Sequence, residues 1–387
     1  MEQRFLVFAS CPADFWPLWA VVEALWRRPT VQVILAVLGR RKEGSFERPE
    51  FALSVPDGVI VEVIQAELHA HQDFIEQTQA LGAITSGMGQ LLLAWRPDVV
   101  VIMGDRYELL ATLGPVTLYG APIAHIGGGD VTSGAFDDAI RNAVSRLSAI
   151  HLCGSAESAS RLIAMGVEPQ AVHVTGEPAL DRLSHLAQKH NFKDVERALS
   201  CRLEHPLGLL AYHPPTAIEQ DWRHEVESLI CACSCFRSVI VTHPNSEPGS
   251  RWLLARLQEW EREQHGVVIS ESLGKLFPAA MKGCDVMIGN SSAGIVEAPF
   301  LKVPSVNVGQ RQEGRLRATS VIDAVGDEKA IRYAIDKALS SQFRRSLVDT
   351  ISPFGDGQAG EQIAAILAEH CNLRTAGYKT LERQIGM

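Results

Sequence analysis

In the first half of the chain, several aspartates follow apolar runs in the sequence. Asp105 follows one such run almost directly, Asp130 follows a second across three glycines, and the pair Asp137-Asp138 comes seven residues later. Clustered carboxylates can differ in pKa, so that one releases a proton while another accepts one. The spacing therefore predicts an acid–base site that contains Asp105, Asp130, Asp137 and Asp138.

Each of these acids also has a plain structural explanation. An aspartate after a strand commonly caps the next helix, and Asp105, Asp137 or Asp138 could do only that. The glycines at 127–129 allow backbone conformations and a close approach of a ligand that a Cβ atom would obstruct. Two neighbouring strand ends that each deliver an acid favour function for Asp105 and Asp130, whereas Asp138 stays open as a helix cap.

Groups suited to a diphosphate follow apolar runs in the second half. His213 and His243 come after two successive runs, and a turn of small residues leads into a helical stretch. Backbone N–H groups at such a turn can cradle phosphate, and arginines add charge. A histidine beside proline is commonly a plain loop residue, and that alternative stays open. The predicted nucleotide-binding residues of this half are His243, Ser291, Ser292, Gly294, Glu297, Arg311 and Arg315, with His213 placed among the catalytic groups and Glu297 facing ribose hydroxyls.

Three closely spaced cysteines, Cys231, Cys233 and Cys235, invite a metal-site interpretation. They fall at the end of a predicted helix, where side chains two residues apart diverge. No second cysteine pair or closely spaced histidine pair completes a zinc pattern. We therefore predict small buried residues there, and no metal.

Composition narrows the class of protein. The 387 residues are 46% hydrophobic and 21% charged, with a net charge of −9, so we expect a globular protein that does not bind nucleic acid. No apolar run approaches the length of a membrane span, and the apolar start is too short for a signal peptide. The eight scattered cysteines suit reduced thiols. We expect a cytoplasmic protein without a membrane partner.

The elements that must position these residues alternate between short apolar runs and amphipathic stretches. Such alternation predicts right-handed βαβ units and parallel sheets. The rhythm restarts after about residue 205, which indicates two Rossmann-like doubly wound domains of the α/β class, with an interdomain cleft at their strand ends. We expect the domains at residues 1–185 and 186–355, followed over 356–387 by a helix that packs across both and a tail. The predicted strands are Phe5–Ala9, Val31–Leu38, Val59–Ile64, Val99–Met103, Pro122–Ile126, Ile150–Cys153, Val172–Val174, Leu207–Tyr212, Ser238–Val241, Val267–Ile269, Val286–Ile288 and Ser305–Val308.

Taken in order, these motifs resemble the hydrolysing UDP-N-acetylglucosamine 2-epimerase family, including its members in bacterial sialic and legionaminic acid pathways. The matching segments run through both halves: Met103–Glu108, Ala121–Ile126, Gly128–Thr132, Gly134–Asp138, Ile288–Ile295, Glu297–Pro299, Arg311–Gln312, Gly314–Arg317, Ser320–Asp323 and Pro353–Gly357.

The resemblance implies a GT-B fold, no metal or other cofactor, and a homodimer. It also implies that a base removes the C2 proton of a nucleotide-linked N-acetylhexosamine, such as UDP-GlcNAc, as the UDP or GDP leaves. Water then adds to C1 of the resulting glycal. The matching positions give Asp105, Asp130 and Asp137 acid–base and stabilising roles and let His213 assist the departing diphosphate. They make Arg106, Asp138 and Arg141 substrate contacts.

The chain departs from the family pattern at a few positions. Pro12 stands where the family usually has a phosphate-binding arginine, and Gly127 stands where a His-Gly-Gly-Glu loop has its histidine. Asp130 shortens the acid of that loop by one methylene, and Asn142 replaces a common histidine. Arg40 and Arg41 could restore positive charge. Three other functions stay open: a non-hydrolysing 2-epimerase, a GT-B glycosyltransferase and an inactive sugar-nucleotide sensor.

Overall fold

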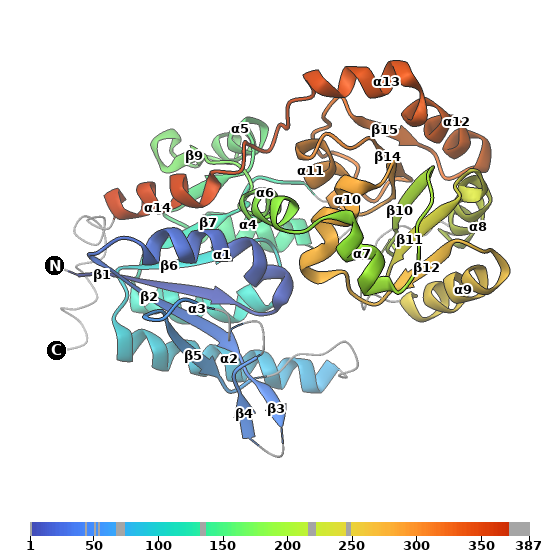
Figure 1. The fold of residues 1–387 in the computed structure, drawn as a ribbon. Coiled ribbons are helices and arrows are strands. Elements are labelled where there is room, and N and C mark those ends of the chain that lie inside the picture. The colour runs from blue at the N-terminus through green and yellow to red at the C-terminus, as the bar shows by residue number, and fades with distance from the viewer. Residues whose placement is uncertain are drawn as a thin grey trace, which may run out of the picture. The chain divides into compact units, whose positions relative to one another are not determined.

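Two parallel sheets organise the chain in the computed structural model (Figure 1). The structure describes residues 2–42, 45–49, 52, 55–66, 74–131, 137–215, 222–244 and 249–370, apart from the side chains of residues 12, 13, 40–42, 45, 46 and 137. Two compact units divide the chain, one formed by residues 1–130, 136–182 and 355–387, the other by 131–135 and 183–354. One division between the units falls between residues 182 and 183, and the domain bounds expected from the sequence stay a prediction.

The first unit contains a parallel sheet with the strand order β5-β2-β1-β6-β7-β8-β9. Its strands are β1 (Gln3–Ala9), β2 (Val31–Leu38), β5 (Ile60–Ile64), β6 (Val99–Met103), β7 (Ile123–Ile126), β8 (Ile150–Cys153) and β9 (Val172–Val174). Its helices are α1 (Pro12–Trp26), α2 (Phe74–Trp95), α3 (Glu108–Tyr119), α4 (Asp137–Leu147), α5 (Ala156–Ala164) and α14 (Ala359–His370), and α6 (Ala179–Lys189) starts in this unit. Two short antiparallel strands, β3 (Arg40–Lys42) and β4 (Ser45–Glu47), come between β2 and β5 in the sequence.

Alternation along β1 shows how the sheet is buried on both faces. Phe5 and Val7 join a core cluster that contains α1 and α14, whereas Leu6 and Phe8 join the cluster of α2, α3 and α4. Successive strand residues point to opposite faces, so each face needs its own helical layer. Full burial of an aliphatic or aromatic side chain contributes about 1.5–3 kcal/mol, which makes these runs strongly sheet-forming in this setting.

The second unit repeats the arrangement with the order β12-β11-β10-β13-β14-β15. Its strands are β10 (Leu207–Ala211), β11 (Ser238–Thr242), β12 (Val267–Ser270), β13 (Val286–Gly289), β14 (Ser305–Val308) and β15 (Val321–Ala324). Its helices are α7 (Phe192–Leu199), α8 (Trp222–Ala232), α9 (Ser250–Glu263), α10 (Phe277–Gly283), α11 (Ala293–Phe300), α12 (Glu328–Leu339) and α13 (Ser341–Ser346). The predicted α/β class with two Rossmann-like sheets is confirmed.

The last described helix, α14, returns to the first unit and packs on α1. The Asp181 carboxylate accepts hydrogen bonds from the backbone N–H groups of Ala359 and Gly360, at 3.0 and 2.7 Å. Asp181 therefore satisfies two of the donors that the start of a helix leaves unpaired. A Cβ atom at Gly360 would lie 2.7 Å from the Ala20 carbonyl oxygen, so only glycine allows this contact with α1.

The helices contain no membrane span: within the described part of the chain, none combines the length and the apolar character that crossing a bilayer requires. The described residues also contain no group of three or more metal-ligating side chains. Cys233 is buried, in a short helical turn after α8, whereas Cys235 is partly exposed and Cys231 is exposed. The prediction that these cysteines are buried is therefore confirmed for Cys233 and wrong for Cys231.

Candidate active site

Asp105 lies at the carboxyl edge of the first sheet, in the turn that follows β6. Gly104 turns the chain with φ +84°, a conformation that favours glycine, while its N–H still bonds the Ile126 carbonyl at 2.9 Å. The next helix begins only at Glu108, after Tyr107. Asp105 is therefore not a helix cap, and the structural alternative for this residue is wrong.

The buried guanidinium of Arg141 on α4 contacts three acidic residues at this edge of the sheet. The side chain is 3% exposed and pairs with the carboxylates of Asp105 and Asp138, the latter at 2.6 Å. Its Nη1 also donates to the Asp130 carbonyl oxygen at 2.8 Å. A buried charge needs such partners, because an unpaired one is costly. Asp138 thus binds Arg141, one turn further along the same helix.

Asp130 ends the glycine turn after β7 and is oriented by a neighbouring helix. Its Oδ1 accepts a hydrogen bond from Ser158 Oγ of α5 at 2.6 Å. A Cβ atom at Gly129 would clash with the Ser158 carbonyl, and one at Gly128 would lie 3.0 Å from both His125 Nδ1 and Ser145 Oγ. These two glycines make room for the protein's own atoms, and the sequence interpretation, which reserved the space for a ligand, did not anticipate this.

Arg106 is held on one edge by protein carboxylates. Its Nε and Nη2 donate to Glu108 Oε1 at 3.1 and 2.6 Å, and Glu108 is buried. Burial raises the pKa of the nearby Asp14 carboxyl, while a hydrogen bond from Ser10 and the positive charge of Arg106 oppose that rise. The Arg106 side chain is 42% exposed, so the guanidinium remains accessible to an anionic ligand.

Several sequence predictions fall on side chains outside the described ones. Asp137 begins α4, and Pro12 occupies the start of α1, but nothing is described of either side chain. The same holds for Arg40 and Arg41, whose backbone forms β3.

His213 follows β10 in the second unit and is clamped by Asn290. Its backbone N–H donates to Asn290 Oδ1, and its carbonyl accepts from Asn290 Nδ2, both at 2.7 Å. The ring is 8% exposed. Burial, and secondarily the charge of Arg311, lowers its pKa to about 4. His213 is therefore neutral at physiological pH, so its ring adds no charge beside a phosphate.

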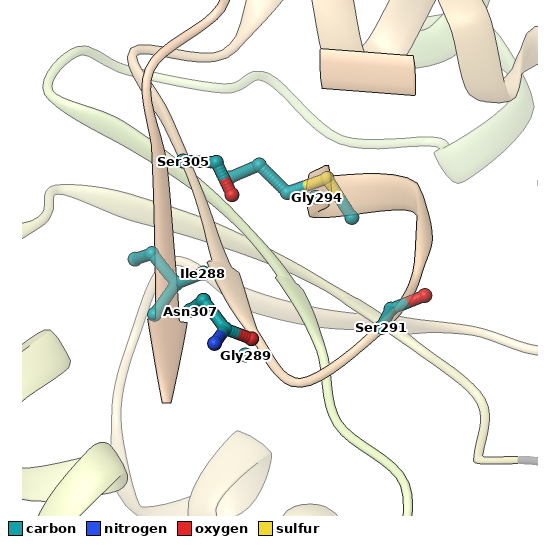
Figure 2. Close-up of a pocket in the computed structure, with 7 residues that line it drawn as sticks. Ile288, Gly289, Ser291, Gly294, Ser305 and Asn307 are labelled. Carbon is teal, nitrogen blue, oxygen red and sulfur yellow. The ribbon is translucent and has the colours of Figure 1, made fainter. Parts of the chain in front are cut away.

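The turn after β13 brings small residues to the start of α11 (Figure 2). Gly289 has φ +128°, and a Cβ atom there would clash with the Ala211 carbonyl. The Ser291 hydroxyl points away from the Asn307 side chain in Figure 2. The space between this turn and Ser305 and Asn307 has no room for a water molecule, so a ligand would meet the outer side of the turn.

Two of the predicted nucleotide-binding residues lie on α11. A Cβ atom at Gly294 would be 2.6 Å from Ser305 Oγ, which indicates that glycine is needed there for packing on β14. Glu297 is partly buried, and burial raises the pKa of its carboxyl to about 7. Ser292, just before the helix, is exposed.

The loop after β14 closes over the same turn. Arg311 Nη1 and Gln312 Nε2 both donate to the Asn290 carbonyl, at 3.2 and 2.9 Å. Arg317 ties the loop together by donating to Asp323 and to the carbonyl oxygens of Gln312 and Arg315. The Nε of Arg315 is buried and makes no hydrogen bond within the described residues.

His243 follows β11, as predicted, and its ring lies beside the next proline. Nδ1 is 3.1 Å from the Pro244 carbonyl oxygen, so in the neutral ring that nitrogen carries the proton and Nε2 is a hydrogen-bond acceptor. The backbone N–H of His243 extends the sheet by bonding the Ser270 carbonyl at 3.0 Å.

Sequence reasoning did not assign the residues that hold these groups in place. They include Ser158, Asn290, Gln312 and Arg317. Ser158 lies on a helix 28 residues from Asp130, and no local pattern announces that contact. Asn290 does carry a signal, because an amide side chain within a glycine–serine turn after a buried strand is suited to bridging two backbone segments.

Comparison with known proteins gives a consistent result. The family model described as UDP-N-acetylglucosamine 2-epimerase matches residues 23–368. The GDP/UDP-N,N'-diacetylbacillosamine 2-epimerase (hydrolyzing) of Campylobacter jejuni is 32% identical over 319 residues, 81% of this chain and 82% of that protein. The UDP-N,N'-diacetylbacillosamine 2-epimerase (hydrolyzing) of Legionella pneumophila is 27% identical, over 95% of this chain and 96% of its own.

Solved structures agree on the fold. The S. aureus MnaA–UDP structure has a TM-score of 0.77 at 16% identity and covers 96% of this chain and 98% of its own. The UDP-GlcNAc 2-epimerase from Neisseria meningitidis bound to UDP-GlcNAc has a TM-score of 0.73 at 18% identity, with 95% and 100% covered. At such identities the likeness supports the GT-B fold that the sequence predicted. Together with the family match, which spans most of the sequence, it shows that the chain belongs to the UDP-N-acetylglucosamine 2-epimerase family.

Proposed function

We propose that this protein is a hydrolysing 2-epimerase that acts on a UDP- or GDP-linked N-acetylhexosamine, UDP-GlcNAc or a 2,4-diacetamido relative. The main observation behind this proposal is that Arg141 binds the carboxylates of Asp105 and Asp138 and the carbonyl oxygen of Asp130 at the ends of β6 and β7. Similarity to two relatives whose names specify hydrolysis supports this choice within the family.

The reaction assigns a task to each acid. A carboxylate removes the C2 proton while the bond from C1 to the nucleotide oxygen breaks, which yields a glycal and the nucleoside diphosphate. Water then adds its oxygen to C1 and loses a proton to a carboxylate, while a carboxylic acid returns a proton to C2 on the opposite face. Asp130 and Asp137 are the proposed acid–base pair. Asp105, paired with Arg141, supplies fixed charge near the cationic transition state.

The second unit supplies groups for the nucleotide. Neutral His213, the N–H groups of the turn with Ser291 and Ser292, and the arginines Arg311 and Arg315 suit a diphosphate. Glu297 is the proposed partner of the ribose hydroxyls. No cofactor takes part in this scheme. We also propose a cytoplasmic homodimer.

Product analysis tests the proposal. Incubation with a panel of UDP- and GDP-linked N-acetyl sugars, followed by NMR, should show a free 2-epimerised sugar and nucleoside diphosphate. An epimerised sugar still attached to the nucleotide would instead identify a non-hydrolysing epimerase. Turnover that requires an acceptor would identify a glycosyltransferase, and nucleotide binding without turnover would identify a sensor.

The variant Asp130→Asn tests whether Asp130 is needed for turnover and not for nucleotide binding. We expect its turnover to fall at least about a hundredfold, in line with loss of a general acid or base, with its melting temperature and UDP affinity near those of the wild type. The matched control is Asp57→Asn, the same change at an exposed turn. Retained turnover in the Asp130 variant would remove that residue from the mechanism.

A further inference from the structure

A buried histidine contacts the turn that carries Asp105. His125 is the third residue of β7, is fully buried, and lies opposite Ile102 of β6 in the sheet register. Its Nε2 is 2.8 Å from the Gly104 carbonyl oxygen. Because a carbonyl can only accept, Nε2 must carry the ring proton and donate it there.

The other ring nitrogen is fixed from α4. Ser145 Oγ lies 3.0 Å from His125 Nδ1, and Nδ1 can only accept once the proton is on Nε2. The Ser145 hydroxyl is therefore the donor. The chain of contacts runs from Ser145 to His125 and on to the carbonyl of Gly104. The carbonyl selects the tautomer, and the hydroxyl holds the other nitrogen of the ring.

Burial keeps this imidazole neutral. Burial lowers the pKa of His125 to about 4, the hydrogen bond to Gly104 opposes that fall, and the neighbouring His151 adds to it. His151 lies opposite His125 in the register of β7 and β8, and burial lowers its pKa to about 4 as well. A neutral His125 has one donor and one acceptor, and the two contacts occupy both.

Helix α4 also contacts Asp105 directly, through Arg141. Arg141 and Ser145 are four residues apart on α4, so they share one face of the helix. Arg141 pairs with the Asp105 carboxylate, while Ser145 acts on the preceding peptide through His125. The N–H of Gly104 is also bonded, to Ile126, so both ends of that residue are fixed by β7.

The space around these contacts leaves little freedom. A Cβ atom at Gly128 would lie 3.0 Å from both His125 Nδ1 and Ser145 Oγ, tighter than ordinary contact. The glycine turn that ends in Asp130 thus passes directly over the His125–Ser145 hydrogen bond. A shift of the His125–Ser145 hydrogen bond would therefore displace both Asp105 and Asp130.

We propose that Ser145 and His125 are positioning residues that set the direction of the Asp105 carboxylate, with Ser145 holding in place the imidazole that bonds the Gly104 carbonyl. The inference rests on the proposed function, because the consequence of misplacing Asp105 is loss of turnover. A displacement of a catalytic group by a fraction of an ångström lowers turnover without weakening nucleotide binding, which other residues provide.

The test compares Ser145→Ala with Ser145→Thr, which keeps the hydroxyl, and with Ser148→Ala as the matched control. Ser148 Oγ donates to the Val144 carbonyl and touches neither acid. We expect kcat of Ser145→Ala to fall about tenfold with KM within about twofold of wild type. Ser145→Thr should recover most of the loss, and Ser148→Ala should match the wild type. Equal kcat in Ser145→Ala and wild type, or equal losses in the two alanine variants, would overturn the proposal.

A second readout does not depend on turnover. The ¹⁵N shifts of the histidine rings, with His125 assigned by its absence in His125→Asn, should show the Nε2–H tautomer in both proteins and a displaced Nδ1 resonance in Ser145→Ala, where Nδ1 loses its hydrogen bond. An unchanged Nδ1 resonance in Ser145→Ala would overturn the inference. A wild-type Nδ1–H tautomer would overturn the inference even if the enzyme is active. Absence of turnover on every nucleotide sugar, with the Nε2–H tautomer present, would instead overturn the proposed function and leave only the hydrogen-bond chain.

Discussion

Glu297 shows how burial alone can prepare a side chain for a ligand. It is the fifth residue of α11, and burial raises the pKa of its carboxyl from 4.5 to about 7. The folded chain therefore prefers the protonated form, and the stability that this proton provides is complete below pH 4.5 and lost as the pH rises through about 7. Ribose hydroxyls that donate to the carboxylate would favour the charged form and reverse that preference.

We predict that UDP binding releases a proton from Glu297 and strengthens between pH 6 and pH 8. The variant Glu297→Gln resembles the neutral acid, so it should bind UDP about as well as wild type at pH 6 and about tenfold more weakly at pH 8. Titration calorimetry in two buffers of different ionisation enthalpy measures both quantities. Titrations of UDP itself and of other residues are common to the two proteins and cancel in the comparison. The same pH dependence in both proteins would exclude a role for Glu297.

At the scale of the elements, two central strands of the first sheet carry buried, neutral histidines. His125 on β7 and His151 on β8 each have a pKa of about 4, against an ordinary value of 6.5, chiefly because of burial. The unfolded chain accepts these protons readily and the folded chain does not. The stability is therefore complete above pH 6.5 and falls as the pH drops towards 4. Each histidine accounts for on the order of 3 kcal/mol over that interval.

We predict that His151→Asn reduces this acid sensitivity. The melting temperature of the variant should fall less than that of the wild type between pH 7 and pH 4.5, because one of the protons that drive unfolding is gone. His151 is chosen because it makes no contact with Gly104 or Ser145 among the described interactions. His265→Asn, at an exposed position, is the control and should follow the wild type. Parallel curves for all three proteins would contradict the prediction.

The elements also show what the sequence could and could not predict. Val31–Leu38 and Ile150–Cys153 were predicted with the observed bounds, because a strand buried on both faces needs a nearly continuous apolar run, which each has apart from one polar residue. Val321–Ala324 was missed, since it is a short strand at the sheet edge with a polar aspartate inside. The helix Phe192–Leu199 was also missed within a polar stretch, although Asn191 and Asp194 form a capping box that could have revealed it.

The residues of the candidate site also differ in how far the sequence alone could predict them. Asp105, Asp130 and His213 could be found because parallel strands bring their carboxyl ends to one edge of a sheet. The groups that orient them could not, because Ser145 and Ser158 lie on helices whose rotation about their axes is set by packing. A contact such as that of Ser158 with Asp130 depends on that rotation and on the absence of a side chain at Gly129.

At the scale of the whole molecule, the described helices α2 and α3 carry few charges and expose several leucines. Helices α2 and α3 pack together, and each contains a single charged residue, Glu76 and the buried Glu108. Leu93, Leu110 and Leu118 on these helices are 62%, 48% and 73% exposed. Because each chain carries a net charge of −9, two copies would associate most readily through an uncharged surface.

We predict that this surface forms the interface of the proposed homodimer. Sedimentation equilibrium should give about twice the 42.2 kDa of the chain for the wild type, and Leu118→Glu should shift the protein to monomers, because it places like charges opposite each other across a two-fold interface. Leu147→Glu is the matched control, since Leu147 is 46% exposed at the end of α4, and it should remain dimeric. A monomeric wild type would refute the dimer itself. A dimer that survives Leu118→Glu, or that dissociates equally with Leu147→Glu, would place the interface elsewhere on the molecule.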